Sequence, residues 1–466
     1  MHQFKSKLFF FKLQNKQSYY TLILIAVLYT IALIIRIESN TLNESINDQS
    51  RDSYSYIETA NLIKTGVYFK RDIEFNHAVS LTKRPFIYPL FLMILGGQKN
   101  LILIIIIQHL IAVVCAYLMI LFFEKIGGTH PLWLALAIAL TPASIYFYHL
   151  IMSETLTMLC SSIILILLLN ISNKKCFISL QIIIGILPFI RPIFFPFTIC
   201  NLLFFICCRN FSFQLRLYAI IPVLLCTGSF FFNKYRTDYA HFSSIENINL
   251  VDFNITMFKN ATLGGEKGIN WDDSIQQKAL QYHDFPSRSA YLGNVAKHEI
   301  FINGPDYAKF HIICSIKALF SSGKTDFIFF NPIGSIQNNQ NNIINSYYNK
   351  GILTVCKNYL ENYLDEIIKE KSATGKLILI YFIPVTLFQI LKWPFICIGI
   401  YVSRQRILST SGLYMIFFLC YNIFITGPVS NPRYLLPIDP IIFMAFALGA
   451  QNVCSLFKIE NKKRIA

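Results

Sequence analysis

The sequence predicts an all-α polytopic membrane protein, on the basis of three observations. Of the 466 residues, 54% are hydrophobic and only 14% are charged, whereas an average soluble protein has roughly 25% charged residues. Apolar runs long enough to cross a bilayer recur along the chain, and short basic segments flank them. Because backbone polar groups in lipid need partners within their own segment, helices are favoured. We therefore expect about ten membrane-spanning helices.

The formal net charge of +16 does not indicate nucleic-acid binding, because the basic residues gather beside apolar runs. Lysine and arginine in such positions favour the cytoplasmic side of a membrane. Four lysines between positions 5 and 16 precede the first apolar run and predict a cytoplasmic N-terminus. The twelve cysteines lie mostly in apolar runs, where they pack as small hydrophobic side chains. Whether Cys314 and Cys356 pair is left open.

Residues 1–232 are expected to form an N-terminal transmembrane module with a first outer loop at 36–98. In this loop, a capping-box pattern at Ser55–Glu58 and helical spacing predict a surface helix that ends at Gly66. Pro85–Gly97 predicts a second short helix at the interface. The spans expected in this module are Tyr20–Ile35, Leu101–Phe123, Pro131–Tyr148, Thr155–Ile171 and Leu217–Phe232, with a hairpin of two short spans in Phe177–Cys208.

The hairpin in Phe177–Cys208 is preferred to one long helix because of its prolines and its arginine. Proline costs about 3 kcal/mol in a helix interior, and a lone arginine at mid-membrane is costly. A break at Pro188 and Arg191-Pro192 near the outer surface satisfies both constraints. A single helix would instead place the polar region after Asn233 in the cytoplasm.

Residues 233–376 predict a mostly helical extracytoplasmic insertion. It includes two amphipathic helices within Pro286–Ser322 and an asparagine-rich loop at Asn331–Asn345. Residues 377–466 predict the last helices and a basic cytoplasmic tail, Lys458–Arg464. The expected spans are Leu377–Val402, which has a possible kink at Lys392–Pro394, Leu413–Thr426 and Ile438–Phe457.

This topology brings five charged residues from distant segments to the outer face: Asp52, Arg84, Glu154, Arg191 and Arg433. Charges at membrane depth are costly unless they are paired or functional, so this set favours a site for an anionic, lipid-borne substrate. Each also has a structural alternative. The two acids can cap helices, and the arginines can anchor helix ends at the interface, Arg191 least easily. Weaker candidates are Tyr56, Lys83, Tyr88, His149 and Tyr434.

Short motifs resemble the GT-C polytopic glycosyltransferases, in the branch of protein O-mannosyltransferases and the aminoarabinose transferases of lipid A. Asp52, Tyr56, Ala60 and Gly66, followed by RPFIYPLFL at 84–92, resemble the first outer loop of that branch. Phe86-Ile87 stands where the branch commonly has Pro-Gly. Further resemblances lie in SETL at 153–156, RP at 191–192 and NPRYLLPIDP at 431–440, where Leu435 replaces a frequent second arginine. Together they cover about 20–233 and 377–457.

The resemblance implies transfer of a sugar from a polyprenyl-phosphate donor to an acceptor hydroxyl, amine or phosphate on the extracytoplasmic face, with inversion. Asp52 would be the general base, and Glu154 would orient the acceptor or hold an arginine. Arg84, Arg191 and Arg433 would bind the donor phosphate, because guanidinium groups stay charged and bind phosphate bidentately. We predict no metal site and no required cofactor, and a divalent cation at Asp52 is left open.

The partners expected are the lipid-linked donor, a glycan, lipid or protein acceptor, and membrane lipids. The asparagine-, isoleucine- and lysine-rich composition favours a bacterial plasma (inner) membrane, with both termini cytoplasmic. Two other functions stay open. One is a flippase or transporter of lipid-linked sugars, and the other is a polysaccharide polymerase or ligase.

Overall fold

The computed structural model describes residues 12–38, 52–208, 210–324, 326–327, 365, 367–369 and 372–465. Within these ranges the chain is helical and has no β-strand beyond an isolated bridge between Glu74 and Asp284. An all-α membrane protein is thus confirmed in its coarse features. Six described helices are long and apolar enough to cross a bilayer: Lys16–Glu38, Gly97–Lys125, Phe213–Thr237, Gly375–Val402, Thr410–Val429 and Pro432–Leu456.

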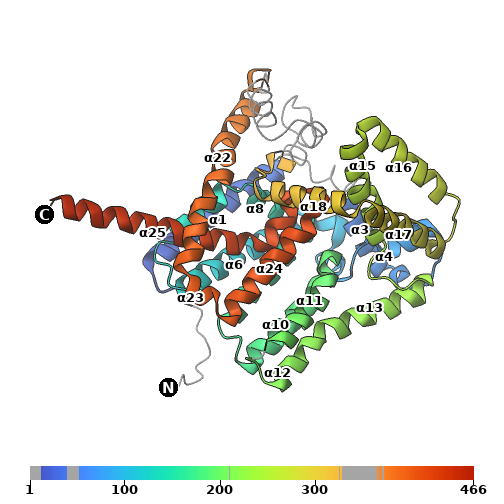
Figure 1. The fold of residues 1–466 in the computed structure, drawn as a ribbon, viewed down its shortest axis with the longest axis horizontal. Helices are drawn as coiled ribbons and strands as arrows, with labels where there is room; N and C mark the ends of the chain where they lie inside the picture. Colours follow the sequence, from blue (N-terminus) through green and yellow to red (C-terminus); the bar gives the residue numbers. More distant parts are fainter. Residues whose placement is uncertain are drawn as a thin grey trace.

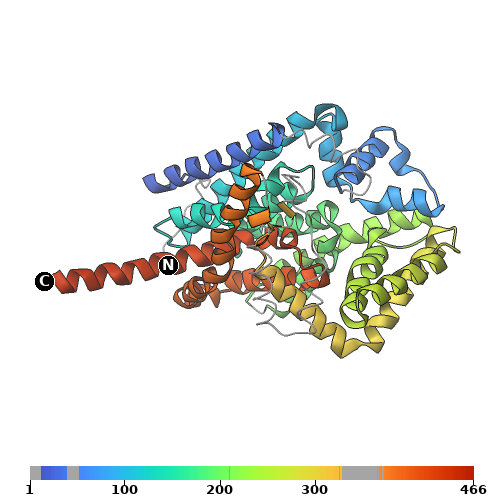
Figure 2. The same cartoon turned by 90° about the horizontal axis from the view of Figure 1, so that it is seen from above.

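The N-terminal half has both α1 and α9 packed against the long α6 (Figure 1, Figure 2). Its elements are α1 (Lys16–Glu38), α3 (Asp52–Lys64), η1 (Val67–Phe69), α4 (Phe75–Lys83), α5 (Ile87–Ile94), η2 (Gly97–Asn100), α6 (Leu101–Lys125), α7 (Leu132–Ala139), α8 (Ala143–Tyr146), η3 (Phe147–His149), α9 (Glu154–Leu168), α10 (Lys174–Ile190), η4 (Pro192–Phe194), α11 (Phe195–Cys207), α12 (Phe213–Leu217), η5 (Tyr218–Ile220) and α13 (Ile221–Thr237).

The described part of the first loop forms the two short helices that the sequence predicts, α3 and α5. Gly66 follows α3 with φ +74, as expected of a glycine that ends a helix. The predicted capping box is wrong, because α3 already begins at Asp52 and Ser55 lies inside the helix. The Ser55 hydroxyl donates instead to the Asp52 carbonyl oxygen, at 2.8 Å.

The expected span at Pro131–Tyr148 is sharply bent in the structure, as a broken span or a re-entrant loop would be. α7 and the α8–η3 segment meet at an angle of 96°. Pro142 explains the break: proline lacks an N–H and disfavours the helical conformation in the residue before it, Thr141. If this bent pair counts as one span, the candidate spans number seven in the described residues.

The hairpin of short helices in Phe177–Cys208 is confirmed. Phe177 at the start of α10 contacts Phe205 at the end of α11, with ring centroids 4.9 Å apart. Asn201 also donates a hydrogen bond of 2.8 Å to Gln181 across the pair. The break lies at Arg191, which is extended, whereas Pro188 remains within α10.

Residues 245–319 form a helical insertion with its own apolar cluster, which includes Val251, Phe258 and Phe310. Phe75 of α4 packs against Phe285 of α17, so the insertion rests on the first loop. The two predicted amphipathic helices correspond to α17 and α18. Asn331–Asn345 and Cys356 lie outside the described residues. The elements are α14 (Ile245–Asn249), the π-helix η6 (Leu250–Ile255), α15 (Thr256–Leu263), α16 (Gly265–Ala279), α17 (Phe285–Ile302) and α18 (Gly304–Leu319).

The C-terminal helices pack tightly through two glycines. A Cβ on Gly399 would lie 2.0 Å from the Ala445 carbonyl oxygen, and one on Gly449 would lie 1.9 Å from that of Phe395. Small residues let membrane helices approach this closely. α22 continues through Pro394. The elements are α22 (Ala373–Val402), α23 (Arg404–Ile407), α24 (Thr410–Thr426), η7 (Gly427–Val429), η8 (Pro432–Ile438) and α25 (Asp439–Ile465).

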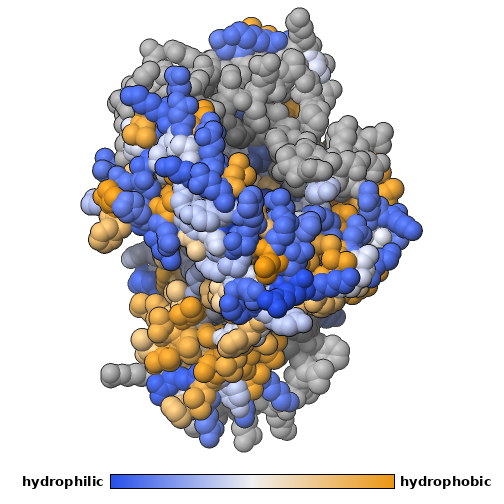
Figure 3. Space-filling view, turned by 90° about the vertical axis from the view of Figure 1, so that its right-hand side faces the viewer, coloured by the Kyte–Doolittle hydropathy of each residue, from blue (hydrophilic) through white to orange (hydrophobic). Residues whose placement is uncertain are grey.

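Apolar and polar surfaces separate on the face shown in Figure 3. Hydrophobic side chains gather in its lower part, the level at which Figure 1 places α10 to α13. Exposed side chains there include Phe213, Leu224 and Phe231. Hydrophilic side chains cover the part above, where the insertion lies. This division is expected of a protein with one part in lipid and the other in water.

Candidate functional site: a buried chain of arginines and carboxylates

The five charged residues that the sequence selects lie together, although they come from five elements. Asp52 begins α3 and Glu154 begins α9. Each arginine stands next to a proline: Arg84 ends α4 before Pro85, Arg191 separates α10 from η4, and Arg433 follows Pro432 in η8. Because proline interrupts helices, these arginines project from breaks between helices.

The five side chains form one alternating chain of ion pairs, with Arg433 at its centre. Arg433 donates from Nη1 to Asp52 Oδ2 at 2.5 Å, and from Nε to Glu154 Oε1. Arg84 donates to the other Asp52 oxygen, Oδ1. Arg191 Nη1 lies 3.6 Å from Glu154 Oε1. The order is therefore Arg84, Asp52, Arg433, Glu154, Arg191.

This charge network is open to solvent mainly at Asp52. The Asp52 side chain is 32% exposed, whereas those of Arg433 and Glu154 are 13% and 1% exposed. Arg84 and Arg191 are also buried. Three guanidinium groups against two carboxylates leave an excess of positive charge. An anion that approached from solvent would reach the network beside Asp52.

Glu154 keeps one carboxylate oxygen without a hydrogen-bond partner among the described residues. Its Oε1 receives Arg433, whereas its buried Oε2 receives no hydrogen bond. Buried polar atoms are nearly always paired, and an unpaired one calls for an explanation. The unused oxygen of Glu154 is a position at which a ligand hydroxyl could donate.

The two arginines on Asp52 control its protonation. Burial acts to raise the pKa of the Asp52 carboxyl, but the charges and hydrogen bonds of Arg84 and Arg433 outweigh this effect. The pKa of Asp52 therefore lies well below its usual range. Asp52 is ionised at neutral pH and is a weak base as long as both arginines hold it.

Two of the weaker candidates, Tyr56 and Tyr434, belong to the network. The Arg84 guanidinium lies 4.4 Å from the centre of the Tyr56 ring, and that of Arg191 lies 5.1 Å from the Tyr434 ring. Such cation–π contacts suit desolvated arginines. Tyr56 also shares a hydrogen bond of 2.8 Å with the Ser153 hydroxyl.

Lys83 and Tyr88 border the network without an ion pair to it among the described residues. Burial and the neighbouring Arg84 charge lower the pKa of Lys83, which also feels the charge of Asp52. Tyr88 packs edge-on against Tyr56 and donates to Gln108 at 3.0 Å, so it supports the site from behind.

His149 is not part of the network. Its Nδ1 lies 3.1 Å from the Ile145 carbonyl oxygen and its Nε2 lies 3.4 Å from Nδ1 of His109. We therefore assign His149 to the packing of η3 against α6.

Asp326 and Asn431 also contact the network, although the sequence does not single out either residue as a site residue. The Asn431 side chain donates to Asp326 Oδ1 at 2.9 Å and accepts from the Arg433 backbone N–H at 2.8 Å. Burial raises the pKa of Asp326 to about 6, although the Asn431 hydrogen bond and the Arg433 charge oppose the rise. A single acid in a polar stretch gives no sequence signal. Asn431, by contrast, precedes Pro432-Arg433 in a quoted motif.

The segment after α13 fixes the end of α4, from which Arg84 projects. Ser243 donates to the Lys83 carbonyl oxygen at 2.9 Å, and His241 Nε2 lies 3.0 Å from the Thr82 hydroxyl. The buried Arg236 donates to the carbonyl oxygens of Tyr68 and Leu81. These contacts hold the main chain on both sides of α4 and so determine where the Arg84 side chain begins.

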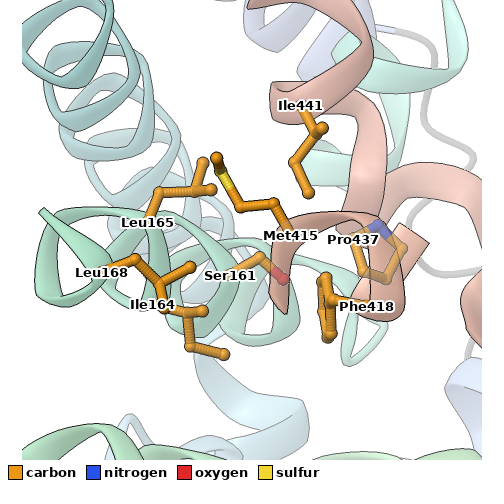
Figure 4. Close-up of a pocket in the computed structure, with 8 residues that line it drawn as sticks. All are labelled: Ser161, Ile164, Leu165, Leu168, Met415, Phe418, Pro437 and Ile441. Carbon is orange, nitrogen blue, oxygen red and sulfur yellow. The ribbon is translucent and has the colours of Figure 1, made fainter. Parts of the chain in front are cut away.

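Below the network the interior is apolar and closed. α9 contributes Ser161 and Ile164 to a narrow crevice, and η8 contributes Pro437 (Figure 4). Ser161 lies seven residues after Glu154 and so on the same face of α9. The crevice has no room for a water molecule. The network is therefore approached from the Asp52 side and not from below.

A divalent cation does not fit the network in the described arrangement. In the described ranges, no group of three His, Cys, Asp or Glu side chains is placed to hold a metal ion. Both oxygens of Asp52 already accept from arginines.

The arrangement can hold an anion and accept a proton. Arginines that pair with carboxylates can exchange them for a phosphate, which offers the same planar, bidentate hydrogen bonds. No protein-family model, curated protein or solved structure matches the chain. The likeness to the GT-C enzymes thus remains a likeness of short motifs.

Proposed function

We propose that this protein is a membrane glycosyltransferase that moves a sugar from a polyprenyl-phosphate donor to an acceptor hydroxyl, amine or phosphate. The observation that supports it best is the buried alternation of three arginines with Asp52 and Glu154, open at Asp52. The proposal includes a GT-C-like arrangement of about ten spans and a site on the extracytoplasmic side of a bacterial plasma membrane. Both termini would be cytoplasmic.

A lipid-linked donor suits this side of the membrane, because nucleotide sugars are cytosolic. Its phosphate would enter beside Asp52 and take over hydrogen bonds that Arg84 and Arg433 now give to that carboxylate. Arg191 would add positive charge. Guanidinium groups are suited to this exchange because they stay ionised and bind phosphate oxygens in pairs.

Phosphate binding would also activate Asp52. As Arg84 and Arg433 turn toward the phosphate, the pKa of Asp52 rises toward its ordinary value and an oxygen becomes free. Asp52 then takes the proton of the acceptor hydroxyl while the acceptor oxygen forms its bond to the anomeric carbon. The bond between that carbon and the phosphate oxygen breaks, and polyprenyl phosphate leaves with the electron pair. Attack opposite the phosphate inverts the anomeric configuration.

Glu154 would orient a hydroxyl of the sugar or of the acceptor. Its unpartnered Oε2 is the acceptor atom for that hydrogen bond. Its Oε1 would keep Arg433 and Arg191 in position. Tyr56 and Tyr434 would keep the guanidinium planes of Arg84 and Arg191 turned toward the phosphate.

The test is carrier release by the purified protein in detergent. A polyprenyl-phosphate sugar is supplied with a membrane glycolipid extract as acceptor, and polyprenyl phosphate and the glycosylated product are measured by mass spectrometry. We expect Asp52→Asn to abolish release while the protein still folds. The exposed Asp273, in α16, offers the matched control, and Asp273→Asn should release carrier at the wild-type rate. Unchanged turnover in a folded Asp52→Asn protein would refute the base assignment.

A flippase for the same lipid is the second candidate, because helices are interrupted near the site. The chain breaks between α7 and α8 and again at Arg191, and transporters often bind substrate at such breaks. Translocation in proteoliposomes without cleavage of the sugar–phosphate bond would favour it. A polymerase or ligase would release carrier like a transferase, and the length of the product would identify it.

A further inference from the structure

A pocket with polar and apolar lining residues lies at the opposite end of α3 from Asp52. It is a cavity of about 330 Å³ between the last turn of α3 and the turn that leads into α6. Asn61 and Lys64 line it from α3, and Lys99 lines it from η2. Asp52 and Lys64 are the first and last residues of a 13-residue helix, so they lie about 18 Å apart along its axis, at 1.5 Å per residue.

The lining of this pocket suits a phosphate group. Two lysines, Asn61 and Gln98 are among its lining residues, and no acidic residue is. The turn passes through Gly96 and Gly97, with φ +98 and +58, a conformation that glycine adopts without strain. The Gly96 N–H already donates to the Met93 carbonyl oxygen at 3.1 Å, so the side chains of the lining would hold the anion.

The pocket also stands where a membrane span begins. Gly97 is the first residue of the candidate span Gly97–Lys125. Apolar side chains beside it are exposed, 71% for Ile94 and 53% for Ile102. A ligand with an anionic head and an acyl tail would place its head among the lysines and its tail along these isoleucines.

We propose that this pocket binds the phosphate headgroup of an anionic membrane lipid. The pocket would anchor the C-terminal end of α3 to the lipid surface, while the N-terminal end of α3 presents Asp52. This proposal does not depend on the transferase reaction.

The simpler alternative is that Lys64 and Lys99 only reach toward the interface. Lysines near helix ends do so without selecting a headgroup, and Lys64 is also favourably placed at the C-terminus of α3. Such lysines would give a loose preference for anionic membranes, which any pair of surface lysines could supply. A pocket predicts instead a bound lipid that depends on these two lysines.

The experiment compares lipid retention by the full-length protein. The wild type is titrated with phosphatidylglycerol, phosphatidylcholine or soluble glycerol phosphate, and bound ligand is measured by native mass spectrometry. We expect phosphatidylglycerol to bind more tightly than the other two. With about 1 kcal/mol per lysine near an anionic headgroup, and 1.4 kcal/mol per factor of ten, K64Q/K99Q should weaken it about 30-fold.

The matched control is K70Q/K267Q, which removes two exposed lysines outside the pocket and should change the affinity less than 3-fold. Thermal unfolding without lipid shows whether both double variants are folded. If K64Q/K99Q is not folded, the single variants K64Q and K99Q are measured in its place. Equal losses in the pocket and control variants would overturn the proposal. Equal affinity of the wild type for phosphatidylglycerol and phosphatidylcholine would also overturn the proposal. Tighter binding of glycerol phosphate than of either lipid would overturn it too and would assign the site to a soluble phosphate.

Discussion

Replacing Arg433 by methionine should destabilise the protein more than any other single change in the network. Arg433 is the only residue that pairs with both carboxylates of the network in the described structure. Without it, Asp52 keeps Arg84, but Glu154 keeps only Arg191, at 3.6 Å. Glu154 is 1% exposed, so water cannot replace the lost partner.

The size of the stability loss follows from the weaker pairing of the buried Glu154 carboxylate. Removing one partner of a buried ion pair typically costs about 3–5 kcal/mol. Unfolding entropy is about 2.1 cal/mol/K per residue, or about 1 kcal/mol/K for 466 residues. The loss therefore corresponds to a decrease of about 3–5 °C in Tm if the chain unfolds as one unit. Because Glu154 also pairs with Arg191, the double variant E154Q/R433M leaves Arg191 unpaired, and the losses of the two single variants should depart from additivity by about 1–3 kcal/mol.

The assay is a double-mutant cycle of R433M, E154Q and E154Q/R433M, followed by thermal unfolding in detergent. The control cycle uses Arg71 and Asp238, 2.5 Å apart and much more exposed, at 58% and 42%. Their coupling should be about 1 kcal/mol or less. If R433M unfolds within 1 °C of the wild type, or the losses of the two single variants simply add in the double variant, the network is not a coupled unit.

Two further predictions concern the surroundings of the site. Because burial raises the pKa of Asp326 to about 6, above the unfolded value of about 3.9, the fold disfavours its ionised form. Wild-type stability should fall relative to that of Asp326→Asn as pH rises from about 4 to 6; parallel Tm curves would contradict this. Gly449→Ala should lower Tm because its Cβ meets the Phe395 carbonyl oxygen, whereas Gly228→Ala, with open space, should not; equal shifts would contradict the close packing.

The sequence predicts that the five charged side chains of the network lie close together, because the membrane topology places their segments at the same face. Arg191 and Glu154 lie in apolar surroundings, where a charge without a partner is costly. Apolar runs and basic flanks then place them at one level with Asp52. The sequence does not show which carboxylate each arginine binds. That Arg433 bridges Asp52 and Glu154 depends on how η8 packs against α9, which no local pattern encodes.

Other misses have local physical causes. The capping-box pattern at Ser55 occurs inside α3, because the helix starts three residues earlier at an acid that also suits a helix start. Pro142 indicates the bend between α7 and α8. The expected span does not include this bend because that span follows from the mean hydropathy of the whole segment. Asp326 stands between a short polar stretch and an apolar run and belongs to no motif, so its approach to Asn431 follows only from the fold.

The most direct test of the central claim is binding of polyprenyl monophosphate, the product common to every donor of the proposed class. Wild-type protein should bind it more tightly than the uncharged polyprenol. Because hydrogen bonds to charged groups contribute about 1.5–3 kcal/mol, Arg84→Gln and Arg433→Gln should each weaken binding about 10–100-fold, and K64Q/K99Q should change it little. If both arginine variants bind polyprenyl phosphate as tightly as the wild type does, the network does not hold the carrier phosphate.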